Sequence, residues 1–288
     1  MNRIRLKNLA VVLAVVLAGT TAAEAVQIIG LTNNPGAAQG VVVFDSAAPG
    51  TILSSASLTG LASGESLLSI DARPAGGAIY GLSSASKLYT INVATGALSQ
   101  VGAGFTTPLS GTTFGFDFNP TIDRIRIVSN ADQNIVAHPI TGAANVATTT
   151  PVFYPAGDAN ANANPNVVHH AYDRNFVGGV TSQLRAIDTN LDILVTQANN
   201  AGTLGTIGSL GVDATEVGGF DIGAGGGAFA AFNAGGATST LYRINLATGA
   251  ATSIGSIPAV IAGITVVPEP STIAIGLLAL GGLGIRRR

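Results

Sequence analysis

Four aspartates recur at nearly equal intervals, each just after a short apolar run. The four are Asp71, Asp117, Asp173 and Asp221, spaced by 46, 56 and 48 residues, and Thr265 takes the equivalent place in a fifth copy. If the strand that carries each aspartate is the innermost of its unit, the carboxylates converge at one level of a central channel. A set of ligands made only of oxygen suits calcium or magnesium, so a divalent cation or a polar sugar is the ligand class that this pattern indicates.

A structural role for the same aspartates is the alternative. The Asp-x-x-Pro pattern at 71–74 and 117–120 is typical of a turn in which the carboxylate accepts hydrogen bonds from backbone N–H groups. In that case the aspartates stabilise the fold and bind nothing.

A second candidate for calcium is the loop that begins at Asp158. Asp158, Asn160 and Asn162 have the spacing that opens a calcium-binding loop. However, Ala163 stands where the pattern needs glycine, and His169 stands where it needs a bidentate glutamate. The sequence therefore favours a solvated polar loop here, with Asp158 as its candidate ligand.

Nucleophilic or histidine-based catalysis has little support in the sequence. Cysteine is absent, no Gly-x-Ser-x-Gly elbow exposes a serine, and adjacent His169 and His170 point to opposite faces of a strand. His138 falls at a turn position that Asp45, Asn92 and Asn245 hold in other copies, which predicts a hydrogen-bonding turn residue. We assign no catalytic residue.

The elements that must position these residues are repeated units. A glycine follows a polar turn five times, at Gly50, Gly96, Gly142, Gly202 and Gly249, with spacings of 46, 46, 60 and 47 residues. A β-rich run precedes each glycine and a shorter one follows it, which predicts a hairpin closed by glycine at positive φ. Repeats of 40–50 residues with about four short strands are typical of propeller blades.

The ends of the repeat array complement one another. The first unit opens directly on its second strand (QIIGLT), and residues 262–267 supply a spare strand at the other end. We therefore predict an all-β, five-bladed propeller over 26–267, closed by a C-terminal strand that completes the first blade. The long interval contains residues 151–167, which have no strand or helix period and are predicted to form an inserted surface loop.

Both termini have the composition of export signals. Residues 1–25 combine basic residues, an apolar run and the small residues Ala23 and Ala25 at the positions that signal peptidase requires. Residues 268–288 combine Pro268, Glu269 and Pro270 with a thirteen-residue apolar run and three arginines. Such a run forms a helix of roughly 20 Å, short for a bilayer core, and the arginines would stay cytoplasmic.

The charge of the body restricts its partners. Residues 26–267 contain seven basic and thirteen acidic residues, a net charge of −6, with Lys87 as the only lysine. Nucleic acid is disfavoured, because phosphate binding needs clustered Lys and Arg. Arg124 and Arg126 alternate with isoleucines, so we expect both to lie on one side of a strand and to pair with Asp123 or an acid of the next unit.

The stretch GFDFNP at 115–120 with DRIRIVS at 123–129 resembles the signature of a bacterial domain of unknown function (DUF4394), and later blocks such as DILVTQ are similar to it too. That resemblance implies a propeller-like β fold and no activity. The C-terminal segment resembles a PEP-CTERM sorting signal, which implies handling by an exosortase in an envelope or matrix setting.

Together these features predict an exported, non-enzymatic binding or matrix protein, processed by signal peptidase and exosortase and attached to the membrane only through its terminal helices. Extracellular polysaccharide is the partner class we expect. We expect no cofactor except a calcium ion at the repeated aspartates. The alternative is a glycan hydrolase or lyase that uses paired carboxylates at the channel; the absence of tryptophan and of any glutamate among the repeated acids argues against it.

Overall fold

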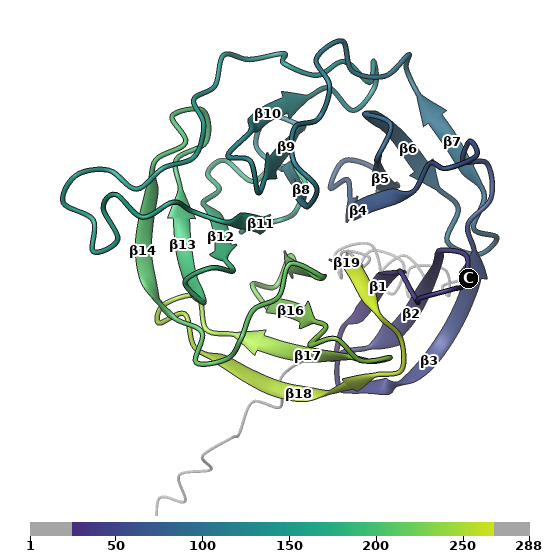
Figure 1. The fold of residues 1–288 in the computed structure, drawn as a ribbon. Coiled ribbons are helices and arrows are strands. Elements are labelled where there is room, and N and C mark those ends of the chain that lie inside the picture. Colours follow the sequence, from purple (N-terminus) through teal and green to yellow (C-terminus); the bar gives the residue numbers. More distant parts are fainter. Residues whose placement is uncertain (1–24, 268–288) are drawn as a thin grey trace, which may run out of the picture.

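The computed structural model describes residues 25–267, which form an all-β ring (Figure 1). This range contains nineteen strands and no helix, so no helical segment within it is long and apolar enough to cross a bilayer. Residues 1–24 of the predicted signal peptide, with Ala23, and the sorting segment, with Pro268, Glu269 and Pro270, lie outside the described residues. Ala25 is the first described residue and is exposed.

The strands form five antiparallel sheets arranged as blades around an axis, which confirms the predicted five-bladed propeller. From the axis outward, the first blade contains β19 (Ile261–Val266), β1 (Gln27–Thr32), β2 (Gly40–Asp45) and β3 (Ala48–Ser57). The second contains β4 (Leu67–Ala72), β5 (Ile79–Ser83), β6 (Lys87–Ile91) and β7 (Leu98–Val101).

The other three blades follow in chain order. The third has three strands, β8 (Phe114–Asn119), β9 (Arg124–Ser129) and β10 (Asn134–Ala137). The fourth contains β11 (Val167–Tyr172), β12 (Leu184–Asp188), β13 (Ile193–Gln197) and β14 (Leu204–Ser209). The fifth contains β15 (Gly218–Ile222), β16 (Ala228–Phe232), β17 (Ser239–Ile244) and β18 (Ala251–Ile257).

The first blade is assembled from both ends of the described chain. β19 lies antiparallel to β1, with Ile28 opposite Val266 and Gly30 opposite Ile264. β1 continues the sheet outward to β2. Because β19 provides the innermost strand, the second strand of this blade has a hydrogen-bonded neighbour on each side.

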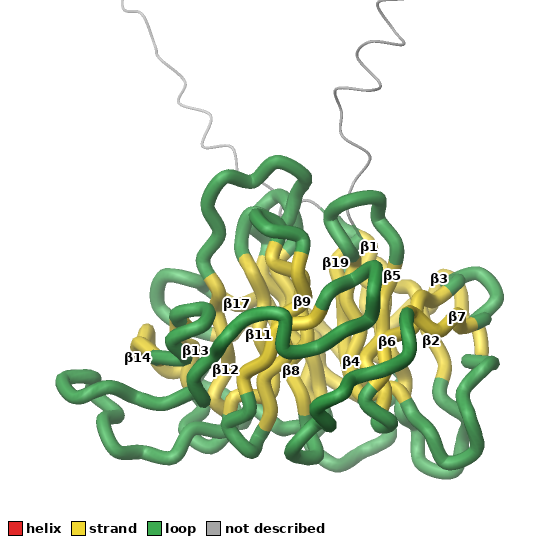
Figure 2. Tube along the Cα trace, turned by 90° about the horizontal axis from the view of Figure 1, so that it is seen from above, coloured by secondary structure: helices red, strands yellow, loops and turns green. Residues whose placement is uncertain are grey.

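The third blade lacks the outer strand that the repeat predicts. Only a bridge between Ala137 and Ala144 and a hydrogen bond from Val146 N–H to the Val136 carbonyl continue its edge. The chain then leaves the blade and runs outside β14, where Phe153 bridges Thr203 (Figures 1 and 2). The insertion at 151–167 is thus a loop up to Asn166, and its last residue, Val167, begins β11. The loop is not wholly on the surface, because Val152 and Tyr154 are buried in the core cluster of the fourth blade.

The predicted hairpin turns occur in four of the five copies. Gly96, Gly142, Gly202 and Gly249 have φ between 68° and 86°. His138 accepts hydrogen bonds through Nδ1 from the N–H groups of Ile140 and Thr141, as Asn92 does from its own turn, so its predicted role is confirmed.

The prediction for Gly50 was wrong. Asp45 pairs with Ala48, and its Oδ1 accepts the N–H of Ala47, so a shorter turn joins β2 to β3. Gly50 therefore lies within β3 and outside the positive-φ region.

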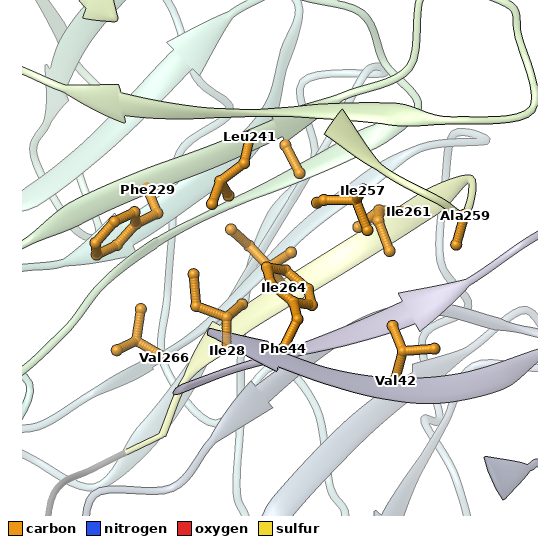
Figure 3. Packing of buried hydrophobic residues seen from close by; sticks show 11 residues of the cluster. Ile28, Val42, Phe44, Phe229, Leu241, Ile257, Ala259, Ile261, Ile264 and Val266 are labelled. Carbon is orange, nitrogen blue, oxygen red and sulfur yellow. The ribbon is translucent and has the colours of Figure 1, made fainter. Parts of the chain in front are cut away.

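The apolar core consists of five clusters, each lying at an interface between neighbouring blades. Figure 3 shows the cluster between the fifth and first blades, where Phe229 and Leu241 face Ile28 and Phe44 across the boundary. Burying both faces of every sheet in this way makes each blade depend on its two neighbours.

Loops gather on two opposite faces of the ring (Figure 2). The innermost strands surround the axis and all run along it in the same direction: β4, β8, β11, β15 and β19. We call the face where they end the exit face, because Val267 leaves β19 there, and the face where they begin the mouth face.

Candidate functional site

The structure brings together three of the four repeated aspartates. Asp71 lies on β4, Asp117 on β8 and Asp221 on β15, each 1% exposed and each near the exit-face end of its innermost strand. One carboxylate oxygen from each lies within 4.8 Å of the others. Thr265 on β19 is fully buried in the same ring.

Each of these side chains contacts the backbone of the next blade. Asp71 Oδ2 accepts the N–H of Phe118 at 2.8 Å, Asp117 Oδ1 accepts the N–H of Tyr172 at 2.9 Å, and Asp221 Oδ2 accepts the N–H of Val266 at 2.6 Å. Thr265 Oγ1 accepts the N–H of Ala72 at 3.0 Å and donates to Asp71 Oδ1. We call this set of inter-blade hydrogen bonds the clasp.

The clasp also shows why Asp173 is absent from the cluster. In three strands, the residue that donates its N–H to the clasp comes directly after the residue whose side chain is part of it: Asp117 in β8, Thr265 in β19 and Asp71 in β4. In β11 the donor is Tyr172, so Ala171 occupies the equivalent side-chain position. Asp173 lies two residues further on, half-buried in the next loop, where Oδ1 accepts the N–H of Gln183.

The alignment of the repeats in the sequence placed the aspartate position of β11 two residues too late, because Ala171-Tyr172-Asp173 resembles the ends of the other innermost strands. Alanine has no side-chain acceptor, so the clasp has no side-chain bond from the fourth blade to the fifth. The Ile222 N–H instead bonds to Asp221 Oδ1 of its own strand.

Burial and mutual repulsion dominate the electrostatics of the cluster. Burial first, and then the charge of Asp221, raise the pKa of Asp71 well above its ordinary value. Burial, then the charges of Asp71 and Asp221, do the same to the pKa of Asp117. Burial raises the pKa of Asp221 to about 6, against the hydrogen bonds from Val266 and Ile222. In solution near neutral pH this cluster must hold protons or a cation.

The donor set fits a hard divalent cation. Calcium binds oxygen at about 2.3–2.6 Å, so two oxygens on opposite sides of an ion are about 5 Å apart. The three carboxylates of the cluster meet that limit. The residues that would hold such an ion are Asp71, Asp117 and Asp221, and Asp173 would not contribute.

A cavity of 140 Å³ opens at the mouth face of the channel. Its polar lining includes Asn33, Gln39, Thr113, His169 and Glu216. Glu216 accepts hydrogen bonds from Asn166 Nδ2 at 2.7 Å and from Thr113 Oγ1 at 3.2 Å, and Gln39 bonds to the backbone of Leu67 through both of its amide atoms. These contacts hold the polar groups in place before any ligand arrives.

The sequence analysis missed this mouth cavity. Ser66, Thr113 and Asn166 each come immediately before the innermost strand of their blade. They lie five, four and seven residues before Asp71, Asp117 and Asp173, so the alignment of the aspartates does not bring them to one position.

Below the mouth cavity the channel is nearly closed. The space between Ser69, Gly115, His170 and Gly219 has a volume of only 10 Å³, about one water molecule. His170 is 1% exposed and its Nε2 lies 3.1 Å from the Arg126 carbonyl. Burial lowers the pKa of His169 to about 4 and that of His170 to about 3, so both are neutral at physiological pH. A sugar entering at the mouth therefore cannot reach the carboxylates.

The Asp158 loop is tied to β14. Asp158 Oδ2 accepts the N–H of Thr206 at 2.8 Å, and Oδ1 accepts the Thr206 hydroxyl and the N–H of Asn160. Burial opposes the effect, but these hydrogen bonds from Thr206 and Asn160 lower the pKa of Asp158. Asn160 also bonds to Thr206, through Nδ2. The first two positions of the calcium-like spacing thus contact one threonine.

Arg124 and Arg126 do not form the predicted ion pairs. Asp123 pairs with Arg73 of the second blade, at 2.5 Å. Arg124 donates to the carbonyls of Ile122 and Asp123. Arg126 is 3% exposed and donates to the amide oxygens of Asn134 and Asn200.

Comparison with known families confirms both resemblances seen in the sequence. The model of the family described as domain of unknown function (DUF4394) matches residues 40–265. The chain belongs to this family. The PEP-CTERM protein-sorting motif matches residues 266–288, which indicates export, membrane-associated sorting and processing by an exosortase.

The similar solved structures are remote from this chain. One is the nidogen/laminin complex, with 11% identity, a TM-score of 0.49, and coverage of 85% of this chain and 98% of that one. Another is TolB from Acinetobacter baumannii, with 11% identity, a TM-score of 0.45, and coverage of 85% and 67%. None of the curated proteins matches the chain. These similarities carry no argument about function.

Proposed function

We propose that this DUF4394 protein is a non-enzymatic binding protein of the outer envelope or extracellular matrix, whose mouth cavity holds a segment of extracellular polysaccharide. The observation that carries the proposal is the 140 Å³ cavity, open at the mouth face, in which Glu216 is fixed by Asn166 and Thr113. Preformed amide, hydroxyl and carboxylate groups are what a polyhydroxylated ligand needs for orientation. The volume of the cavity is comparable to that of a single sugar unit.

In this proposal the chain has three parts. Signal peptidase removes residues 1–25, residues 26–267 form the binding body, and residues 268–288 hold the body at the membrane until an exosortase acts on them. The apolar run from Ile273 to Ile285 is the proposed membrane helix.

The hydrolase or lyase alternative is not favoured. The carboxylates that it needs are 1% exposed and engaged in the clasp, and the channel above them admits only a water molecule. A glycosidic bond would have to lie between two accessible acids.

Glycan binding is tested by titrating the purified body with neutral and acidic polysaccharide fragments and recording the melting temperature. We expect a ligand-dependent rise for the parent protein, which Glu216→Gln and Gln39→Ala reduce. Asp158→Asn is the control, because Asp158 bonds to Thr206 of the outer strand β14 and does not line the cavity. This variant should retain the rise. If no fragment raises the melting temperature of the folded parent, the binding proposal is wrong.

A structural calcium ion at Asp71, Asp117 and Asp221 is a second proposal, supported by the convergence of their oxygens within 4.8 Å. The ion would neutralise the cluster and strengthen the clasp, without contact to the glycan. Elemental analysis of the purified body tests it: one calcium per chain, lost on chelation, supports the site. A metal-free protein whose stability ignores added calcium would leave protons as the neutralising species.

A further inference from the structure

Basic side chains of the body are concentrated at the exit face. All six arginines of residues 26–267 lie in exit-face turns or on the strands next to them: Arg73, Arg124, Arg126, Arg174, Arg185 and Arg243. The acids outside the buried cluster on this side are Asp45, Asp123 and Asp173. Outside the buried cluster, this side therefore has six basic residues against three acidic ones, although the body as a whole is negative.

The mouth face has the opposite charge. Its turns and strand ends carry six acids, Glu65, Asp132, Asp188, Asp192, Asp213 and Glu216, against one basic residue, Lys87. Lys87 is paired with Glu65 at 3.3 Å. The ring thus has a charge difference along its axis, from a negative mouth to a positive exit face.

Large apolar side chains are also exposed on the exit face. Val177 and Val180, which are 69% and 84% exposed, lie in the loop between β11 and β12. Ile122 and Ile140 occupy neighbouring exit-face turns and are exposed by more than half. Among the described residues, Val217 is the counterpart on the mouth face and is 39% exposed. Exposed apolar side chains beside basic ones are typical of surfaces that dock on lipid.

One groove of the exit face has a cationic floor. It has a volume of 450 Å³ and lies between the β8–β9 turn, which contributes Ile122, and the β11–β12 loop, which contributes Thr181 and Ser182. Arg126 lies at its base with Nε unpartnered, and only amide oxygens accept from its Nη atoms. Arg73–Asp123 and Lys87–Glu65 are the ion pairs of the described residues, so no carboxylate lies within ion-pair distance of Arg126. A phosphate group would supply the missing counter-charge.

The path of the chain brings this face to a membrane. Val267 leaves the body at the exit face, and only residues 268–272 separate it from the apolar run that begins at Ile273. Five residues reach at most about 18 Å. A body attached through that run must hold its exit face within this distance of the bilayer.

We infer that the exit face docks on an anionic phospholipid surface, with the exposed valines in the headgroup region and a lipid phosphate above Arg126. This inference rests on the proposed membrane attachment of residues 268–288. Docking in this orientation points the mouth cavity away from the membrane, toward the matrix.

The test uses the body without its tail, since all five blades and the clasp lie within residues 25–267. We expect it to co-sediment with phosphatidylglycerol vesicles at low salt, to be released at high salt, and to ignore phosphatidylcholine vesicles. Arg124→Gln combined with Arg174→Gln, and separately Val177→Ser combined with Val180→Ser, should each lower the bound fraction by at least about fivefold.

Variants of the mouth face and of the groove separate specific docking from nonspecific adsorption to vesicles. Val217→Ser and Lys87→Gln change the mouth face and should leave vesicle binding unchanged. Asn200→Asp places a carboxylate beside Arg126 while keeping an oxygen acceptor, so it should weaken binding without unfolding the protein, as checked by its melting temperature. Equal binding to both lipids, no binding to phosphatidylglycerol, or an equal loss in Val217→Ser overturns the inference.

Failure of docking can be distinguished from failure of the proposed function. If the full chain is exported and attached in cell fractionation but the body ignores anionic vesicles, docking is wrong and the proposed function is unaffected. If the body binds vesicles and no glycan raises its melting temperature, docking stands and the glycan proposal falls.

Discussion

The carboxylate of Asp117 accepts the backbone N–H of Tyr172 at 2.9 Å, across the boundary between the third and fourth blades. It lies on the same ring as two other buried acids, which gives it two opposed effects on stability: the hydrogen bond stabilises the interface, and the charge repels Asp71 and Asp221.

Substitution of Asp117 should separate these two effects. Asp117→Ala leaves the Tyr172 N–H buried without its acceptor and should lower the free energy of unfolding by about 1–3 kcal/mol. Asp117→Asn keeps an acceptor oxygen and removes the charge, so without metal it should lose less. Urea denaturation at neutral pH measures both. A larger loss in Asp117→Asn than in Asp117→Ala would contradict the clasp.

The stability that the carboxyl cluster contributes should fall as pH rises through about 6 in metal-free buffer. A carboxyl group whose pKa is raised by folding binds its proton more tightly in the folded state, so its contribution is lost as pH rises through the folded pKa. Asp71 and Asp117 have pKa values well above the ordinary one, and that of Asp221 is about 6.

Below pH 6.5 the two histidines oppose this trend, because their folded pKa values of about 4 and 3 make protonation favour the unfolded chain. Asp71→Asn leaves both histidines in place, so the pH-dependent difference in stability between this variant and the parent isolates the contribution of the cluster. In thermal melts, the stability of Asp71→Asn should fall less than that of the parent as pH rises through about 6. An unchanged slope would mean that the cluster does not titrate as described.

Calcium should reverse the pH effect if it binds the cluster. The ion competes with protons for the same oxygens, so its stabilising effect should grow from pH 5 to pH 8. Melting temperatures with calcium and with chelator measure this, and the Asp221→Asn variant should lose most of the difference. Asp173→Asn, two residues beyond the clasp position of β11, is the matched control.

Gly142, in a hairpin turn, and Gly50, within β3, should differ in their tolerance of alanine. Gly142 has a φ of 69°, and a Cβ there would lie 2.1 Å from the Val101 carbonyl oxygen of the second blade. Gly50 is outside the positive-φ region, and its nearest contact would be 3.6 Å away. We expect Gly142→Ala to cost more than about 1 kcal/mol and Gly50→Ala to be near neutral in chemical denaturation.

Removal of the last strand should prevent the ring from closing. Deleting residues 261–267 takes away the neighbour of β1, the Val266 partner of Asp221 and the Thr265 partner of Asp71. We expect loss of the cooperative unfolding transition and aggregation through the exposed edge of β1. Deleting only 268–288 should leave the transition intact, and calorimetry can compare the two truncated proteins.

Repeat arithmetic was sufficient to predict the blade count, because turn glycines and strand runs recur with a nearly constant spacing. It failed where the spacing changes. The interval between Gly142 and Gly202 hides both the missing outer strand of the third blade and the start of β11, and a two-residue error there exchanged Ala171 for Asp173. The short turn at Ser46 and Ala47 similarly displaced the role given to Gly50.

The mouth cavity and the charge difference between the faces could not be seen along the chain. Glu216, Thr113 and Gln39 are far apart in sequence and meet only because the innermost strands share one direction. The same is true of the six arginines, which become a face only when the direction of each strand is known. Arg126 is buried beside Asn200, which lies 74 residues later, and this contact could be predicted only from the packing of the third blade against the fourth.

The pairing of β19 with β1 has a consequence for biogenesis. A polypeptide threaded through an export channel from its amino end emerges with its first blade one strand short, and that vacancy lasts until nearly all of the body has crossed. The strand that fills it is joined directly to the sorting segment. Completion of the ring and arrival of the sorting segment at the membrane are therefore nearly simultaneous, so a chain that has not finished folding would still be beside the bilayer when its tail is recognised.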